Sequence, residues 1–231
     1  MTMGADAMTM PGAVHPAASA LPGRTAALPR AGRRVRRLLA AACCAALAGC
    51  GVGQGGPGPR LLDLGVDNAP APRAPAREPI VLAPVTAAPL AGGTAVIWRV
   101  GDGTAPQSYA TYRWAAPPEV LVGQRIAERL SRQGPVLEQN LAGSLPQLQL
   151  GLSRFEQEFA PDGSSSRGRL AMQAVLVREG QVLGQLRIDR SVPAPTADAP
   201  GGAQALRRAT DQAADELSAW LARRLVAARE R

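Results

Sequence analysis

The sequence predicts a single α+β domain, in which a mostly antiparallel sheet of about five to six strands is covered by two helices. Segments rich in β-branched and aromatic residues alternate with Gly- and Pro-rich turns, which is typical of strands. Two longer segments, 117–130 and 203–228, have apolar residues at helical spacing. Because the strands are grouped on either side of the first helix, the order of elements argues against a parallel doubly wound sheet.

Four of the expected strands precede the first helix. Residues 60–65 form a short first strand, and residues 80–85 form a second one that is closed by a proline. Residues 94–100 and 108–114 contain valine, isoleucine, tyrosine and tryptophan, which favour strands. Between the first two strands, residues 66–78 form a Pro-rich loop that we expect to be extended and solvated.

The first helix is predicted at Pro117 and Pro118, because proline suits the first helical turn. Val122, Ile126 and Leu130 then recur every four residues, with charged residues on the opposite side. A Gly-Pro pair follows the last of them, and we expect the helix to end there.

A long strand follows this helix. Leu148, Leu150 and Leu152 alternate with polar residues or glycine, which is the two-residue period of a half-buried strand. Phe155 falls on the opposite phase of this alternation, and a β-bulge near Ser153 would explain the change.

A hairpin and a second helix complete the domain. Residues 169–177 and 182–190 are the two expected strands, and the Glu-Gly pair between them suits a tight turn. After a loop rich in proline and glycine, the apolar stripe in residues 203–228 predicts an amphipathic helix of about 26 residues.

The N-terminal region has the charge order of a secretory signal peptide. An arginine-rich segment, 30–37, is followed by the ten uncharged and mostly apolar residues 38–47. A membrane-spanning helix needs about 20 apolar residues, so this segment is too short to be a permanent span. We therefore assign residues 1–49 to a signal peptide, whose length leaves open a start codon downstream of Met1.

The predicted cleavage site contains a cysteine. Leu47, Ala48, Gly49 and Cys50 resemble a lipobox, the motif in which diacylglycerol is attached to the cysteine sulfur before cleavage. A further N-acyl chain, typically palmitate, would make the anchor effectively permanent, because one chain alone gives only marginal membrane binding. Gly51 follows the cysteine, a pattern that is usual in lipoproteins of the outer membrane. We expect residues 50–59 to be a flexible tether and residues 60–229 to be the folded domain.

The composition excludes much of the chemistry that enzymes use. The only histidine, His15, precedes the predicted cleavage site, and the chain has no lysine. The mature chain therefore has no histidine for acid-base catalysis, no lysine for Schiff-base chemistry and no set of Cys and His residues for a metal site. We expect no catalytic residues, no metal and no cofactor besides the lipid on Cys50. The leader accounts for +5 of the formal charge of +8, and the nearly balanced remainder does not favour nucleic-acid binding.

Six segments carry short motifs that follow one another in a fixed order: 61–65, 96–99, 109–118, 154–159, 192–199 and 216–221. Taken in order, these motifs resemble the ABC-type transport auxiliary lipoproteins, the PqiC-like family. No single motif is specific, and the resemblance depends on their order and spacing over residues 61–221. Family members usually have an aromatic residue in the first strand, where this chain has Leu61 and Leu62.

The resemblance implies a non-catalytic role beside an ABC transporter. Its partners would be an MCE-domain protein and the permease and ATPase of the same system, which move phospholipid or a sterol-like lipid between membranes. The auxiliary lipoprotein would sit on the periplasmic face of the outer membrane, and it could form a homo-oligomer. Two alternatives remain open at this point: an outer-membrane lipoprotein that plugs or chaperones a β-barrel, and a periplasmic lipid carrier, which needs an apolar cavity of about 300 Å³ or more.

Four large side chains at the expected strand-to-helix junction are candidates for a docking surface. They are Tyr109, Tyr112, Arg113 and Trp114, and Tyr, Trp and Arg are the residue types that dominate interface hot spots. For Trp114 the simpler interpretation is a place in the core, which leaves Tyr109 and Arg113 as the better interface candidates. We also expect Trp98, Trp220, Phe155 and Phe159 in the core, although the two phenylalanines would also suit a lipid groove.

Overall fold

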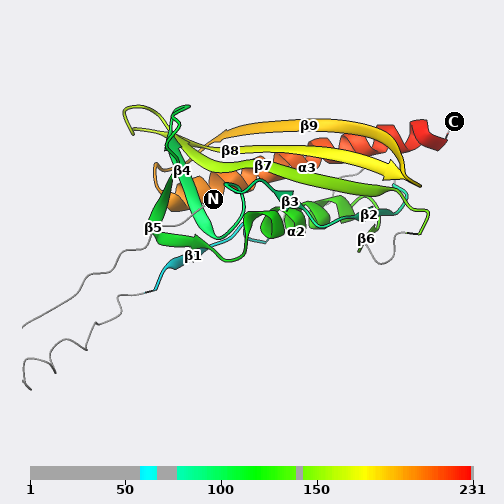
Figure 1. The fold of residues 1–231 in the computed structure, drawn as a ribbon, viewed down its shortest axis with the longest axis horizontal. Coiled ribbons are helices and arrows are strands. Elements are labelled where there is room, and N and C mark those ends of the chain that lie inside the picture. The colour runs from blue at the N-terminus through cyan, green and yellow to red at the C-terminus, as the bar shows by residue number, and fades with distance from the viewer. Residues whose placement is uncertain (1–57, 67–76, 139–142, 230–231) are drawn as a thin grey trace, which may run out of the picture. The chain divides into compact units, whose positions relative to one another are not determined.

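A computed structural model describes residues 58–66, 77–138 and 143–229. In this part of the chain, nine strands and two helices follow one another along the sequence (Figure 1). The strands are β1 (Arg60–Leu62), β2 (Ile80–Leu82), β3 (Thr86–Ala87), β4 (Ala95–Val100), β5 (Gln107–Trp114), β6 (Val136–Leu137), β7 (Gln147–Phe159), β8 (Ser166–Arg178) and β9 (Gln181–Pro193). The helices are α2 (Pro118–Ser131) and α3 (Ala199–Arg229).

The α+β class is confirmed, but the sheet is mixed and larger than the five to six strands expected. Strand β7 pairs along one edge with β8, in antiparallel fashion. Along its other edge it pairs in parallel with β2, β3 and β4 in succession. Strands β5 and β1 extend the sheet beyond β4, and β6 extends it beyond β2. The expectation of a mostly antiparallel sheet was wrong, because three short strands, β2, β3 and β4, run parallel to β7 along one of its edges.

The predicted irregularities of the long strands are present. The pairing of β7 with β8 shifts register between Leu152 and Arg154, and the hydroxyl of Ser153 donates a hydrogen bond to the carbonyl of Ala171 over 3.1 Å. The turn between β8 and β9 consists of Glu179 and Gly180, with φ of 49° and 77°. Two consecutive positive φ angles are the signature of the tight turn that Glu-Gly predicted.

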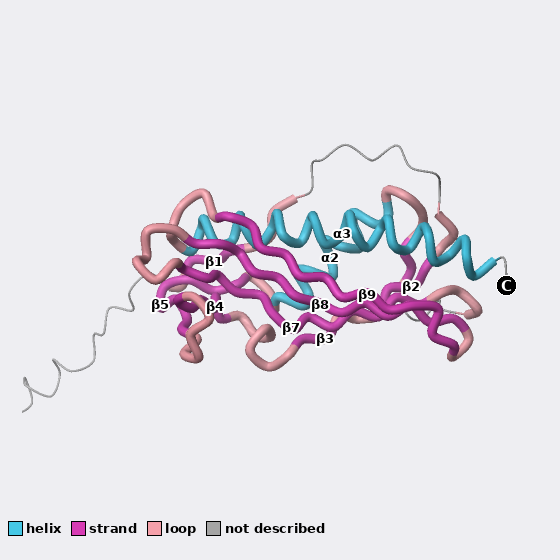
Figure 2. The backbone as a smooth tube through the Cα atoms, turned by 90° about the horizontal axis from the view of Figure 1, so that it is seen from above, coloured by secondary structure: helices cyan, strands magenta, loops and turns pink. Residues whose placement is uncertain are grey.

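Both helices lie on the same side of the long strands (Figure 2). We call this side the closed face of the sheet and the opposite side the open face. On the closed face, the side chains of alternate residues are buried against α2 and α3, as the two-residue period requires. The core includes Leu148, Leu152, Phe155, Leu170, Met172, Leu176 and Ile188 from the sheet and Val122, Ile126, Leu130, Leu206, Leu217, Trp220 and Leu221 from the helices.

Helix α3 begins at Ala199, four residues before the start predicted from the apolar stripe. Asp198 caps it, since its carboxylate accepts hydrogen bonds from the Gly201 amide at 2.8 Å and the Thr196 hydroxyl at 2.7 Å. Gly202 packs so closely on Gln157 that a Cβ atom there would overlap the amide side chain. The prediction placed these glycines in a loop, whereas they are helical residues that allow the helix to approach the sheet.

An arginine joins the two helices and the segment after β1. Arg125 of α2, whose side chain is 3% exposed, donates two hydrogen bonds to the carboxylate of Asp211 of α3, at 2.6 and 2.9 Å. Its remaining terminal nitrogen donates to the carbonyls of Leu64 and Gly65. This bidentate pair fixes the relative position of three segments that are far apart in the sequence.

The open face of the sheet carries charged residues in place of a second layer. Arg99 pairs with Glu156 at 2.7 Å, and Arg169 lies 3.6 Å from both Glu158 and Asp189. These residues alternate along β4, β7, β8 and β9 with the buried residues of the closed face. The long strands are therefore apolar on one side and mainly polar on the other, with the charges gathered around Arg99, Glu156, Glu158 and Arg169.

Candidate functional site

The four predicted docking residues lie along β5, and the last of them, Trp114, is where the chain turns toward α2. The indole of Trp114 is 2% exposed and stacks at a tilt on Phe155, with 5.3 Å between the ring centres. Trp114 and Phe155 are thus core residues, as is Trp220 of α3. Tyr109, Tyr112 and Arg113 are half-buried and line the same end of the sheet.

A bulge in β5 positions these three residues. Ala95 of β4 pairs with Arg113 and Ile97 pairs with Ser108, so Val96 alone faces the four residues between them. The guanidinium of Arg113 turns back on the bulge and donates hydrogen bonds to the carbonyls of Tyr109 and Tyr112, at 2.5 and 2.7 Å. Arg113 therefore supplies donors to carbonyls in a segment where the ladder between the strands is irregular.

The hydroxyl of Tyr109 also points inward. It donates a hydrogen bond to Gln157 over 2.9 Å, and the amide nitrogen of this buried glutamine donates to the Ser166 hydroxyl and the Asp198 carbonyl. Burial raises the pKa of Tyr109 to about 12, with smaller contributions from the charges of Asp198 and Tyr112. The phenol is therefore a neutral structural donor at physiological pH.

Four aromatic residues form a continuous row at this end of the sheet, which we call the aromatic row. The ring centre of Tyr112 lies 6.0 Å from that of Tyr109, which lies 6.2 Å from Trp98, and Trp98 lies 5.5 Å from Phe159. All four side chains are partly exposed, in contrast to the three aromatic residues of the core. We expected both Trp98 and Phe159 in the core, but both are only partly buried, because they lie where the end of β4 pairs with the last residues of β7, outside the buried core.

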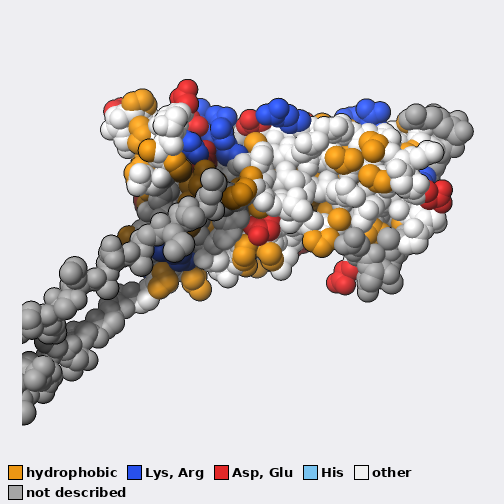
Figure 3. Space-filling view, viewed as in Figure 1, with side chains coloured by type: hydrophobic (Ala, Val, Ile, Leu, Met, Phe, Trp, Pro, Cys, Tyr) orange, Lys and Arg blue, Asp and Glu red, His pale blue; other side chains and the backbone are white. Residues whose placement is uncertain are grey.

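The aromatic row borders an open cleft of about 530 Å³. Val100, which is 46% exposed, and Pro161 add apolar surface, and Asp162 and Asp198 lie on the rim beside α3. Figure 3 shows exposed hydrophobic side chains at the end of the domain where Figure 1 places β4 and β5, as well as elsewhere on this face. Sequence reasoning missed this cleft because its walls come from four separate segments.

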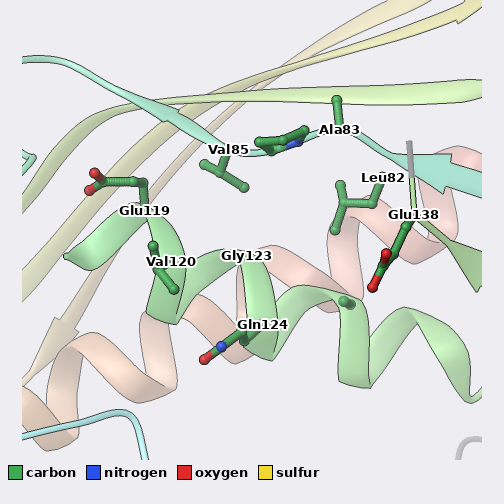
Figure 4. Close-up of a pocket in the computed structure, with 10 residues that line it drawn as sticks. Leu82, Ala83, Val85, Glu119, Val120, Gly123, Gln124 and Glu138 are labelled. Carbon is green, nitrogen blue, oxygen red and sulfur yellow. The ribbon is translucent and has the colours of Figure 1, made fainter. Parts of the chain in front are cut away.

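A second cleft, of about 570 Å³, lies between α2 and the segment that joins β2 to β3 (Figure 4). Its walls are mainly apolar, and Val85 points toward Gly123, where the absence of a side chain leaves room for the valine. Glu119 and Glu138 lie at opposite ends of the cleft. Its volume exceeds the lower limit for a small-molecule site, and the cleft is open to solvent.

The residues assigned to the anchor lie outside the described part of the chain. This applies to Cys50, to the lipobox residues Leu47, Ala48 and Gly49, and to most of the Pro-rich loop. In the described ranges there is no group of three or more His, Cys, Asp or Glu residues that could hold a metal ion. Neither of the two described helices is both long and apolar enough to cross a bilayer.

Solved structures share this arrangement of two helices on one side of a mixed sheet, which defines a class of small α+β domains. A crystal structure of a protein from Xanthomonas campestris matches with a TM-score of 0.64 and 19% identity, covering 74% of this chain and 97% of that one. A second crystal structure, of an uncharacterized protein, matches with a TM-score of 0.59 and 13% identity, covering 71% and 99%. At these identities the likeness concerns the fold alone.

The sequence itself identifies the family. The sequence model of one protein family, the ABC-type transport auxiliary lipoprotein component, matches residues 61–218, which is more than half of the chain. The protein belongs to this family, as the order of motifs predicted. No match was found among curated proteins.

Proposed function

We propose that the protein is a non-catalytic, lipid-anchored auxiliary component of an ABC transport system that moves lipid between membranes with an MCE-domain protein. One observation carries the proposal: the family match begins at residue 61, eleven residues after the cysteine of a lipobox-like motif. A transport lipoprotein domain that directly follows such a cysteine is suited to holding its partners at a membrane surface.

The proposed anchor is a diacylglycerol and an N-acyl chain on Cys50. Several acyl chains on one residue bind a membrane far more tightly than a single chain, because each buried methylene contributes about 0.8 kcal/mol. With Gly51 as the next residue, we assign the anchor to the periplasmic face of the outer membrane. Metabolic labelling with palmitate tests this assignment: the parent chain should be labelled, and Cys50→Ser should not.

The proposed partners are the MCE protein and, through it, the permease and ATPase. A pull-down of the tagged full chain from detergent extracts should recover the MCE subunit and the ABC subunits. The Cys50→Ser variant is the matched control, because it removes the anchor and leaves the folded domain intact. Recovery of none of these subunits with the parent chain would remove the transport role.

The cleft in Figure 4 favours a second candidate, a lipid carrier, because its mainly apolar walls border an open space of about 570 Å³. A carrier has to hold lipid stably in the absence of a membrane. Native mass spectrometry of the Cys50→Ser chain should then show a mass shift of one lipid, and Gly123→Leu, which fills the cleft beside Val85, should abolish it. A lipid-free spectrum excludes this second function.

A further inference from the structure

The hydroxyls of the two tyrosines in the aromatic row, and the neighbouring guanidinium of Arg113, already make hydrogen bonds within the domain, which distinguishes the row from an ordinary polar surface. Tyr109 donates its hydroxyl proton to Gln157, the Tyr112 hydroxyl accepts a hydrogen bond from Arg60 over 3.0 Å, and the Arg113 guanidinium binds backbone carbonyls. What these groups present outward is mainly ring and aliphatic surface. Together with the exposed Val100, the row is an amphipathic surface that can be buried at small polar cost.

The row also lies where the chain enters the fold. Strand β1 runs parallel to β5 with Arg60 opposite Tyr112, and the guanidinium of Arg60 lies 5.3 Å from the centre of the Tyr112 ring. Arg60 is ten residues after Cys50, and ten residues of a Gly-rich tether span only about 17 to 19 Å on average. An anchor on Cys50 therefore keeps this end of the domain close to the bilayer.

The charges around the row indicate which kind of surface it meets. Arg60 and Arg113 contact Tyr112 and Tyr109, whereas the described residues that line the cleft include Asp162 and Asp198 and no arginine, so the cleft has no cluster of cations to attract anionic lipid. Tyrosine and tryptophan are the side chains that concentrate at the interface between headgroups and hydrocarbon. A contact made by these rings beside a cleft without cations suits zwitterionic phospholipid.

We propose that the aromatic row rests in the headgroup region of the bilayer that holds the anchor, with Trp98 and Val100 directed into it. This inference depends on the lipid anchor of the proposed function. It assigns to a lipid surface Tyr109 and Tyr112, two of the four residues that the sequence had suggested for a protein partner. It also directs the opposite end of the domain, with the Glu179-Gly180 turn, away from the membrane.

Fluorescence quenching tests the proposal. The full chain, purified from membranes with its own anchor, is reconstituted in vesicles of phosphatidylethanolamine and phosphatidylcholine, and part of the phosphatidylcholine is brominated near the headgroup. Bromine quenches tryptophan only at short range. We expect part of the emission of the parent chain to be quenched, Trp98→Phe to lose most of this quenching, and Trp220→Phe to retain it.

Two exposed valines provide a matched pair. Val100→Asp places a charge in the aromatic row, and we expect it to reduce the quenching of Trp98. Val182, which is 64% exposed, lies at the start of β9, next to the hairpin turn and at the end of the domain opposite the aromatic row. Val182→Asp should therefore leave the quenching unchanged. Equal quenching in the parent chain, Val100→Asp and Val182→Asp would overturn the proposal.

Vesicle flotation separates this inference from the proposed function. If the parent chain fails to float with the vesicles, the anchor is wrong and the inference falls with it. If the chain floats and Trp98 is not quenched, only the inference is overturned. In that case, protection of Trp98 from acrylamide upon addition of the MCE subunit would show that the row is a protein interface.

Discussion

The two faces of the long strands differ in what they contribute to the protein. On the closed face, Leu176 and its neighbours are fully buried under the helices, whereas on the open face Arg169 and Glu158 remain partly in water. Apolar burial on the closed face removes hydrocarbon from water and supplies most of the stability. On the open face, the 3.6 Å ion pairs of Arg169 contribute little free energy, whereas Arg99 and the buried Glu156 form a close pair. Together these charges keep a broad sheet surface polar.

The largest expected effect comes from a cavity on the closed face. Leu176 is fully buried, and we expect Leu176→Ala to lower the free energy of unfolding by about 3 to 5 kcal/mol. Val175 is its neighbour on the open face and is only half-buried, so Val175→Ala should cost about 1 kcal/mol. Urea denaturation measures both values, and equal losses would contradict the distinction between the faces.

Removing a charged side chain from the helix-covered side should lower the free energy of unfolding more than removing one from the open face. Arg125→Ala leaves Asp211 without its bidentate partner, and we expect it to cost about 3 kcal/mol. Arg169→Ala removes only longer contacts at a more exposed site and should cost less than about 1 kcal/mol. Arg125→Lys should recover only part of the loss, because an ammonium group cannot reproduce the bidentate geometry.

The smallest predicted effect concerns the cap of α3. Asp198→Ala should cost about 1 kcal/mol at pH 7, and Asp198→Asn, which retains the cap, should cost less. Hydrogen bonds from Thr196 and Gly201 lower the pKa of Asp198 below its ordinary value of 3.8. A lowered pKa stabilises the fold above the ordinary value and loses this contribution as the pH falls through the folded value.

Thermal melts at two pH values test this dependence. The difference in Tm between the parent chain and Asp198→Ala should be largest near neutral pH and should shrink at pH values below about 3.8. A difference that grows on acidification would contradict the assignment of Asp198 as an ionised cap.

Local signals in the sequence were sufficient for the long elements. The alternation of Leu148, Leu150 and Leu152, the phase change near Ser153 and the Glu179-Gly180 turn each depend on neighbouring residues, and all three predictions were confirmed. The parallel pairing of β2, β3 and β4 with β7 depends on residues that are 59 to 66 positions apart. Strands of two residues, such as β3 and β6, have no periodicity from which they could be recognised.

The candidate site was predicted only in part, for a similar reason. The concentration of Tyr109, Tyr112, Arg113 and Trp114 was visible in the sequence, but which of these side chains is buried depends on the bulge opposite Val96. The contribution of Phe159 to the row depends on the pairing of β4 with β7, which no local pattern reveals.

If the domain rests on its aromatic row as proposed, the length of the hairpin formed by β8 and β9 sets how far its turn lies from the lipid. Each strand has 13 residues, and at about 3.3 Å per residue the hairpin extends about 40 Å. Because Ser166 pairs with Phe159 at one end and the turn lies at the other, a domain that rests on its aromatic row holds the turn that far from the lipid. The hairpin then acts as a rigid spacer that shortens the gap other subunits have to bridge.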